Sequence, residues 1–252
     1  MTLKFSPSGH RYWLDGKPVP GVTTLIGKGL PKPALPYWAA KCVAEYVADQ
    51  PDAVDQLRMM GRAPMVAALK EVPWQARDEA AIRGTDVHAL AERLVHGLEV
   101  EVPEHLLNHV EGYARFLDRW QVEPVLTEHA VASRKWWYAG TFDLIADVCA
   151  LGKRLLVDLK TSKGVYGETA LQTAAYASAE FYTTDGSDEL PVPEVDGIAV
   201  VHVTTDGSAL YDLGDITEAF RIFTHVSWVA QQTDRIKQFV TAQLTPPSED
   251  AA

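Results

Sequence analysis

The sequence predicts an α/β protein with a central mixed β-sheet flanked by helices, preceded by an N-terminal β-hairpin and a helical region. Helical segments fill most of residues 1–120, whereas β-rich segments alternate with helices from residue 121 onward. The chain has 252 residues, of which 47% are hydrophobic, enough for a sizeable core. We therefore expect a single domain over residues 1–244 (a hairpin and helical part at 1–120, an α/β core at 121–244) and a disordered tail at 245–252.

The N-terminal segment has the pattern of a small hairpin followed by a connector. Asp15-Gly16 is a strong two-residue turn signal within residues 3–20. Residues 21–38 are rich in Gly and Pro, which predicts a connector that contains a short helix.

Proline and glycine divide the helical region. Residues 39–70 have helical composition, interrupted near Pro51. Pro73 fits the start of a helix that ends at Gly97, and Pro103 opens another helix.

The second half of the chain contains short β-rich segments and two helices. Strands are expected where β-branched and apolar residues cluster between turn signals, and helices where apolar residues recur at helical spacing. The expected strands are 125–133, 139–148, 153–160, 196–204 and 209–214, and the expected helices are 166–183 and 216–244.

Charge and cysteine content exclude several classes of protein. The formal net charge of −11 argues against general adhesion to nucleic acid or to an acidic membrane, although a local basic groove remains compatible with it. Cys42 and Cys149 are the only cysteines, so a disulfide framework or a four-cysteine metal site is not expected. Without an apolar signal core or an 18-residue apolar run, we expect a cytoplasmic protein with no membrane span.

Three charged residues lie within the most β-like part of the sequence. If residues 139–148 and 153–160 form an antiparallel hairpin closed by residues 149–152, opposed residues have numbers that sum to 301. Asp143 then faces Asp158, with Lys160 on the same face, because side chains alternate along a strand. The same register pairs Asp147 with Arg154, and the opposite face carries Phe142, Leu144, Ala146, Val148, Leu155, Val157 and Leu159.

Two carboxylates opposite each other repel, so a positive group is expected between them. Mg²⁺ is a hard cation that binds one or two carboxylates and keeps waters and substrate phosphates as its other ligands. A lysine beside it can orient or deprotonate an attacking water, or stabilise charge on phosphorus. The alternative, a solvent-facing hairpin with ordinary surface ion pairs, has equal weight on geometry alone.

Four short motifs follow one another along the chain. They are Gly84-Thr85-x-x-His88, Gly140-x-x-Asp143, Asp158-Leu159-Lys160 and Gln172-x-x-x-Tyr176. In this order they resemble the motifs of the PD-(D/E)XK nucleases, in their RecB-like branch, and in particular those of phage-encoded exonucleases. This resemblance implies a restriction-endonuclease-like core. The chain lacks the four cysteines that hold an iron–sulfur cluster in some members, and also lacks a helicase phosphate-binding loop, so no cluster and no fused helicase are expected.

The resemblance implies a role for each motif residue. His88, Asp143, Asp158 and the Leu159 carbonyl would hold Mg²⁺ or Mn²⁺, and Lys160 would be catalytic together with the two aspartates. Gln172 and Tyr176 would position the DNA strand.

Other residues are candidates from their position alone. Thr161 and Lys163 follow the expected strand 153–160 and are candidates to contact a DNA phosphate. Glu128 is a candidate further carboxylate, and Glu92 lies one helical turn after His88, where a surface salt bridge is the alternative.

A basic and aromatic cluster at residues 134–138 has two interpretations. Single-stranded DNA sites combine cationic groups with rings on which bases stack. The alternative is a hairpin turn whose tryptophans fold back onto the core.

We expect a metal-dependent deoxyribonuclease, in the form of an exonuclease acting on single- or double-stranded DNA ends during phage recombination or processing in the host cytoplasm. The expected partners are DNA, a recombination protein and further copies of the chain. Two alternatives remain: a structure-specific endonuclease, and a catalytically silent DNA-end-binding module of the same fold.

Overall fold

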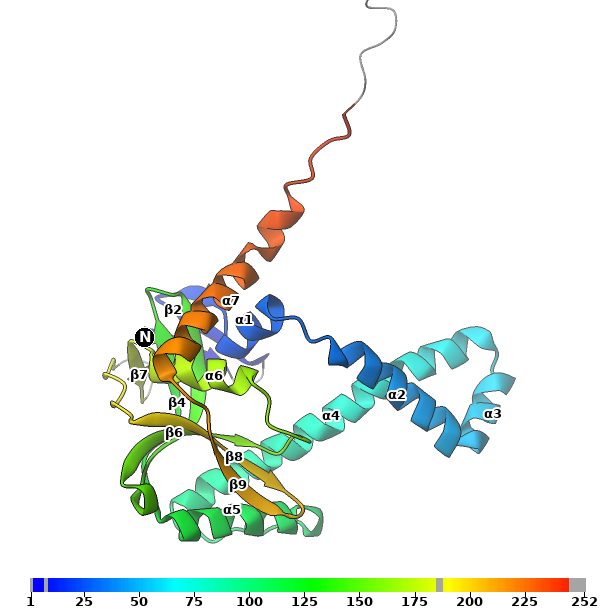
Figure 1. The fold of residues 1–252 in the computed structure, drawn as a ribbon. Coiled ribbons are helices and arrows are strands. Elements are labelled where there is room, and N and C mark those ends of the chain that lie inside the picture. The colour runs from blue at the N-terminus through cyan, green and yellow to red at the C-terminus, as the bar shows by residue number, and fades with distance from the viewer. Residues whose placement is uncertain (1, 7–8, 185–187, 245–252) are drawn as a thin grey trace, which may run out of the picture.

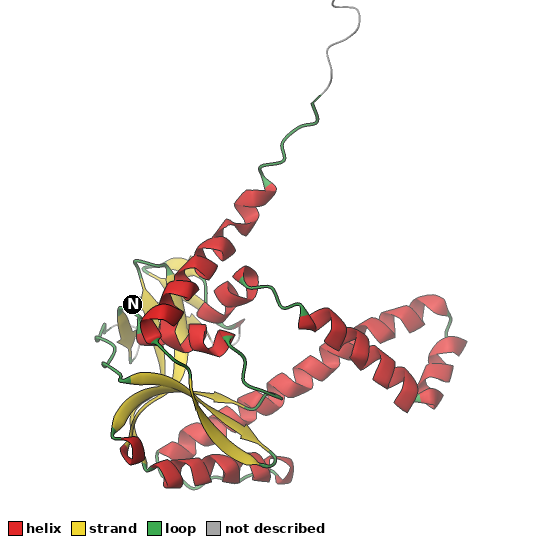
Figure 2. Ribbon diagram, viewed as in Figure 1, coloured by secondary structure: helices red, strands yellow, loops and turns green. Residues whose placement is uncertain are grey.

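A six-stranded mixed sheet lies between two layers of helices, with a separate three-stranded sheet at the N-terminus (Figure 1, Figure 2). This computed structural model describes residues 2–6, 9–184 and 188–244, so the tail expected at 245–252 falls outside the described residues. The α/β fold class predicted from the sequence is confirmed. In the described part of the chain, no helix combines the length and the apolar character needed to cross a membrane.

The N-terminal sheet contains one strand more than the predicted hairpin. Strands β1 (Leu3–Ser6), β2 (Arg11–Leu14) and β3 (Lys17–Val19) pair antiparallel in that order. Asp15 and Gly16 form the predicted turn between β2 and β3, with φ of 51° and 76°. Two consecutive positive φ angles are typical of the type I′ turn that suits a two-residue hairpin.

The helical region begins with α1 (Val22–Gly29), followed by α2 (Ala34–Asp49) and α3 (Pro51–Met59). The 34-residue helix α4 (Arg62–Val95) then returns to the body of the molecule. No residue of α2 is buried, and in α4 only the last third contributes buried residues. Helices α2 and α3 and the start of α4 therefore project from the body as a helical arm (Figure 1).

The prediction that Pro73 starts a helix is wrong, because Pro73 lies inside α4. A proline in a helix interior removes one N–H donor and crowds the carbonyl four residues earlier. The strong helix formers on both sides of Pro73 continue the helix despite this cost. Gly97, in contrast, terminates α4 as predicted, with a φ of 69° and its N–H bonded to the Leu94 carbonyl.

The central sheet has the strand order β7-β4-β5-β6-β8-β9. The only parallel pair among its described strands is β6 with β8, and all other neighbours are antiparallel. The strands are β4 (Val122–Ser133), β5 (Tyr138–Val148), β6 (Lys153–Lys160), β7 (Phe181–Thr183), β8 (Gly197–Thr204) and β9 (Gly207–Asp212).

Two elements of the second half are shorter than expected. Helix α6 (Glu168–Ala177) ends before residues 181–183, which form strand β7 at the sheet edge beside β4. These three residues are aromatic or β-branched, and pairing with β4 outweighs a helical extension. The closing helix α7 (Ile216–Lys237) ends before the expected residue 244.

Each face of the sheet has its own hydrophobic core. Helices α1, α6 and α7 cover one face, where Leu25, Leu171 and Phe223 pack on Ile145 and Leu156. On the other face, α4 and the helical segment formed by η2 (Glu104–Leu106) and α5 (Leu107–Trp120) cover a second core. The sequence motifs in α4 and α6 therefore approach the sheet from opposite faces.

The predicted hairpin register is confirmed from Leu144 to Val148, where each β5 residue pairs with the β6 residue that completes a sum of 301. Asp147 pairs with Arg154 as expected, with Arg154 Nε 2.8 Å from Asp147 Oδ1. The η3 segment (Cys149–Leu151) forms the connection between the two strands.

Beyond Leu144, strands β5 and β6 separate. The β5–β6 pairing ends at Leu144 and Val157, although both strands continue. The edge of β5 that β6 has left forms a parallel bridge between Ala139 and Gly21 instead, with the Ala139 N–H donated to the Pro20 carbonyl. We call this separation the fork; it is bounded by residues 139–143 of β5 and 158–160 of β6.

We predict that Gly29→Ala lowers the free energy of unfolding by about 1–3 kcal/mol, the usual cost of overpacking. A methyl group at Gly29 would lie 2.2 Å from the backbone oxygen of Val226, where α1 crosses α7. Gly27→Ala in the same helix is the matched control, because nothing lies within 4 Å of its added Cβ and alanine favours the helix. Urea denaturation of both variants measures the difference, and equal stabilities would contradict the close crossing.

Candidate metal centre and active site

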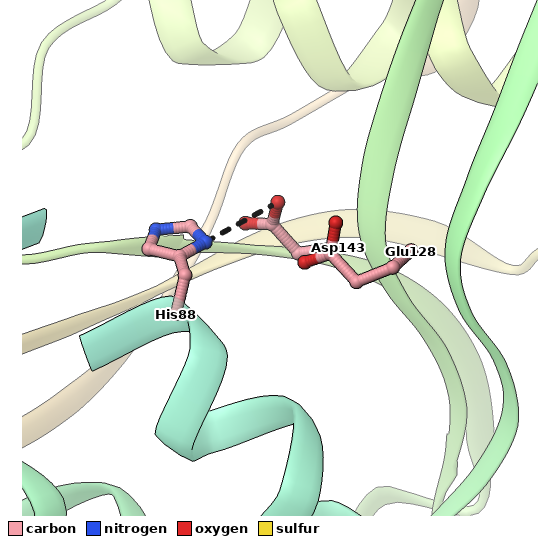
Figure 3. Close-up of side chains that lie close together, drawn as sticks. All are labelled: His88, Glu128 and Asp143. Carbon is pink, nitrogen blue, oxygen red and sulfur yellow. Dashed lines mark ion pairs between the residues drawn. The ribbon is translucent and has the colours of Figure 1, made fainter. Parts of the chain in front are cut away.

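Three potential metal ligands from three elements meet beside the fork. His88 projects from α4, Glu128 from β4 and Asp143 from β5 (Figure 3). One ligand atom from each lies within 4.8 Å of the others, and His88 Nδ1 is 3.6 Å from Asp143 Oδ1. We call these residues the acidic trio; they are the kind and number of side chains that can bind a divalent cation.

The helical pattern of α4 places His88 in the trio. Val87, Ala91 and Val95 are buried at a spacing of four residues and fix the core-facing side of the helix. His88 lies next to this stripe and so reaches the rim of the sheet. Gly84, one turn earlier, lies beside the end of β6, where an added Cβ would be in ordinary van der Waals contact with Thr161 Oγ1 at 3.6 Å.

The two carboxylates of the trio come from an irregularity that β4 and β5 share. The paired residues pass from Thr127–Leu144 to His129–Phe142 and skip Glu128 and Asp143. Glu128 has a left-handed backbone with a φ of 51°, a conformation that is uncommon for a non-glycine residue in a strand.

The irregularity reverses the face on which β5 side chains lie. Phe142 packs with Ile145 and Leu156 on one face of the sheet, whereas Leu144 belongs to the core on the other face. The prediction that Phe142 shares a face with Leu144 is therefore wrong, because strict alternation ends at Asp143.

The Asp143 carboxylate replaces a strand in the hydrogen-bonding pattern. Its Oδ2 accepts the N–H of Leu159 at 2.7 Å, on the part of β6 that no longer pairs with β5. A buried backbone N–H needs a partner, and here a side chain supplies it. This bond fixes Asp143 at the fork and leaves Oδ1 facing His88.

A cavity of about 20 Å³ adjoins the acidic trio. It has room for one water-sized group. Its polar lining comes from the trio together with Glu92, Tyr113 and Thr127, and apolar side chains of the α4–α5 core close the rest.

Burial and neighbouring charges raise the pKa of the Glu128 carboxyl group. The Glu128 residue is exposed as a whole, but desolvation of its carboxyl group raises its pKa to about 8, with further contributions from the carboxylates of Asp143, Glu92 and Asp158. No arginine or lysine of the described residues forms an ion pair with Glu128 or Asp143. A cation would relieve this repulsion.

Asp158 points away from the trio, toward α6. Its Oδ1 accepts a hydrogen bond from the Gln172 amide at 3.0 Å, and its Oδ2 lies 2.6 Å from the ammonium of Lys160. The Asp158 side chain is only 2% exposed, and apart from this ion pair Oδ2 has no hydrogen-bond partner among the described residues. A buried carboxylate oxygen without a hydrogen-bond donor is able to bind an additional cation.

The charges of Asp158 and Lys160 support each other. Burial and the Asp143 carboxylate raise the pKa of Asp158 to about 6, against the opposing effect of Lys160. Burial lowers the pKa of Lys160, but the carboxylates of Asp158 and Asp143 outweigh it and the net pKa is raised. Lys160 is therefore an ammonium group that stays protonated at neutral pH.

Gln172 and Tyr176 of α6 contact both strands of the fork. Gln172 also donates to the Tyr176 hydroxyl at 3.3 Å, so one amide orients both Asp158 and the tyrosine. The Tyr176 ring packs on Gly140, where an added Cβ would lie 2.3 Å from Cε1. Tyr176 is buried and contacts Gln172 and Gly140; its expected contact with DNA stays a prediction.

The structure brings together most of the sequence-predicted residues, in a different arrangement from the predicted one. His88 and Asp143 meet as expected, Glu128 joins them, and Glu92 lines the adjoining cavity. Asp158 lies with Lys160 and Gln172 rather than in the trio, and Leu159 contributes its N–H to Asp143. The role expected for the Leu159 carbonyl stays a prediction.

Contacts within the protein engage much of the basic and aromatic cluster at 134–138. Arg134 forms ion pairs with Asp15, in the turn between β2 and β3, and with Glu189, between β7 and β8, whereas Lys135 lies over the ring of Trp136. Trp136 packs edge-on against Phe220 of α7. These contacts favour the interpretation that the turn folds back onto the protein.

Two tyrosines at the site were absent from the sequence prediction. Tyr113 of α5 lines the cavity, and the Tyr12 hydroxyl lies 3.0 Å from Thr141 Oγ1 of the Gly140-x-x-Asp143 motif. For Tyr12 and Tyr113, burial is the main reason for a raised pKa, and the Glu128 charge adds to it in both. Neither belongs to a local motif, and only the three-dimensional packing of distant elements identifies them.

Comparison of the chain with models of known protein families finds no match, and neither does a search among curated proteins. The likeness to PD-(D/E)XK nucleases therefore rests on the motif residues themselves. These residues come together around the fork.

We predict that divalent cation binding competes with a proton on Glu128. Because the pKa of this carboxyl is raised to about 8, Mn²⁺ affinity should increase as the pH rises from 6 to 8 and level off above that pH, with release of a proton below it. Isothermal titration calorimetry in buffers of different ionisation enthalpy measures both the Mn²⁺ affinity and the number of protons released.

Glu128→Gln is the test variant, and Glu123→Gln, an exposed position on the same strand, is the matched control. The glutamine at 128 should weaken binding at pH 9 and reduce its pH dependence, whereas the control should behave as wild type. An unchanged pH dependence in the Glu128 variant would exclude Glu128 as the titrating ligand.

Proposed function

We propose that this protein is a metal-dependent nuclease that hydrolyses DNA phosphodiester bonds, most simply as an exonuclease. The observation that carries the proposal is the pairing of two units at the fork: the acidic trio, and Lys160 held by the buried Asp158. Phosphoryl transfer is commonly catalysed by a metal ion bound to carboxylates, together with a fixed positive charge such as a lysine ammonium.

The donor set of the trio fits Mg²⁺ or Mn²⁺. Two carboxylates suit both ions, and the single imidazole favours a transition-metal ion such as Mn²⁺. When bound, such a cation supplies Lewis-acid polarisation of the phosphate and lowers the pKa of a coordinated water. Asp143 would be central to this site, because its two oxygens connect His88 with the β6 backbone.

Lys160 supplies a fixed positive charge next to the trio. Its ammonium is held 2.6 Å from Asp158 and keeps about a third of its side chain exposed, so it is oriented but accessible from solvent. With its pKa raised, it can donate hydrogen bonds to a phosphate oxygen and stabilise the negative charge that develops during attack on phosphorus. Stabilisation of charge, rather than removal of a proton from water, is the role we assign to it.

Gln172 and Tyr176 keep this arrangement rigid. The Gln172 amide bonds Asp158 and Tyr176, and the Tyr176 ring fills the space beside Gly140. A site held by such supporting contacts loses little entropy when substrate binds. The negative net charge of the chain makes the local cations near the fork, rather than the whole surface, the means of binding DNA.

The proposal predicts Mg²⁺- or Mn²⁺-dependent loss of end-labelled linear DNA that stops with chelator. Lys160→Ala should lower the rate by about 100-fold or more, as loss of a charge-stabilising donor does. Lys153→Ala, an exposed lysine at the other end of the same strand, is the matched control and should cleave as wild type.

Closed circular DNA distinguishes the alternatives in the same assay. Resistance of circles supports an exonuclease, and their cleavage indicates an endonuclease with the same site. Tight DNA binding with no cleavage under either metal would contradict the proposal and indicate a binding module. Equal activity of wild type and Lys160→Ala would show that the fork is not the active site.

A further inference from the structure

His202 of β8 lies beside the proposed active site without belonging to any of the motifs. It is the parallel-sheet partner of Lys160, so both residues lie near the carboxyl ends of adjacent strands. Its Nε2 is 2.6 Å from the carbonyl oxygen of Ser162. A carbonyl oxygen only accepts hydrogen bonds, so Nε2 carries the proton and His202 is the donor.

The residues that follow Lys160 form a short loop at 161–164. His202 holds the Ser162 carbonyl, and the Ser162 hydroxyl donates to the Gly164 carbonyl at 2.8 Å. Thr161, at the start of the loop, approaches Gly84 of α4. The loop is thus fixed on one side by β8 and limited on the other by the helix that carries His88.

The loop presents donors that have no partner among the described residues. In the described part of the chain, the exposed Lys163 forms no ion pair and the Thr161 hydroxyl no hydrogen bond. In contrast, Lys160 is paired with Asp158 and Lys32 with Glu168. In a chain of net charge −11, an unpaired lysine next to the active strand is available to an anion.

We propose that the 161–164 loop is a subsite for a DNA backbone phosphate, formed by Thr161 and Lys163, and that His202 is the positioning residue that preforms it. This inference rests on the proposed nuclease function and adds to it the way in which DNA is held. The phosphate bound there would belong to the same DNA strand as the scissile bond, at a neighbouring position. The hydrogen bond from His202 keeps the loop in its binding conformation before substrate arrives.

The function of this bond is conformational rather than a contribution to global stability. Ser162 is exposed, so its carbonyl would accept hydrogen bonds from water if His202 were removed. Loss of His202 therefore makes the loop mobile with little effect on the free energy of unfolding. The affinity for DNA falls, because the loop then has to become ordered on binding.

The test measures binding of a fluorescent single-stranded oligonucleotide of about twelve nucleotides, and of a blunt duplex, in the presence of chelator so that no cleavage occurs. The variants are His202→Ala, His202→Gln, Lys163→Ala and the double variant of His202→Ala with Lys163→Ala. His225→Ala, an exposed histidine on α7, is the matched control.

We expect His202→Ala to weaken binding about five- to tenfold, the size of one lost hydrogen bond, and His202→Gln to restore most of it because its amide can donate to the same carbonyl. Lys163→Ala should weaken binding and reduce the salt dependence by about one phosphate contact. Because His202 acts through the loop, the double variant should bind no more weakly than the weaker of the two single variants.

Losses that add fully in the double variant would overturn the role of His202, and so would a failure of His202→Gln to restore binding. Wild-type affinity of Lys163→Ala would overturn the phosphate subsite. These results leave the nuclease proposal intact when the wild type still cleaves DNA. A wild type that neither binds nor cleaves DNA would overturn both.

Discussion

The separation of β5 from β6 after Leu144 is the constraint on which the rest of the site depends. In a continuous sheet, Asp143 and Asp158 would face each other across a ladder of backbone hydrogen bonds. At the fork, the Asp143 carboxylate takes the N–H of Leu159, and Asp158 turns toward Lys160 and α6. The carboxylates of Asp143 and Asp158, which would repel each other if they were opposed, therefore lie in different environments.

The fork also allows both layers of helices to contribute to one site. Helix α4 covers one face of the sheet and supplies His88, whereas α6 covers the other face and supplies Gln172. In an unbroken sheet these side chains would be separated by the strands. The N-terminal sheet completes the arrangement, because the bridge from Gly21 to Ala139 occupies the edge of β5 that β6 has left, and Tyr12 bonds Thr141 there.

Much of this arrangement follows from local sequence, and the remainder follows from long-range contacts. The β5–β6 register was predictable because a four-residue connection and the apolar alternation determine it. The left-handed backbone at Glu128 was not, because no glycine or asparagine marks it in the sequence. The reversal of faces at Phe142 was likewise hidden, since it occurs where the β4–β5 pairing skips Glu128 and Asp143, which no local pattern marks.

A metal centre at the fork requires that His88, Glu128 and Asp143 bind one divalent cation together. Anomalous scattering from crystals of the protein soaked in Mn²⁺ would locate such an ion. We expect a peak about 2.0–2.4 Å from a nitrogen of His88 and from carboxylate oxygens of Asp143 and Glu128, lost in crystals of Asp143→Asn. A strong peak elsewhere, with none among these three side chains, would contradict it.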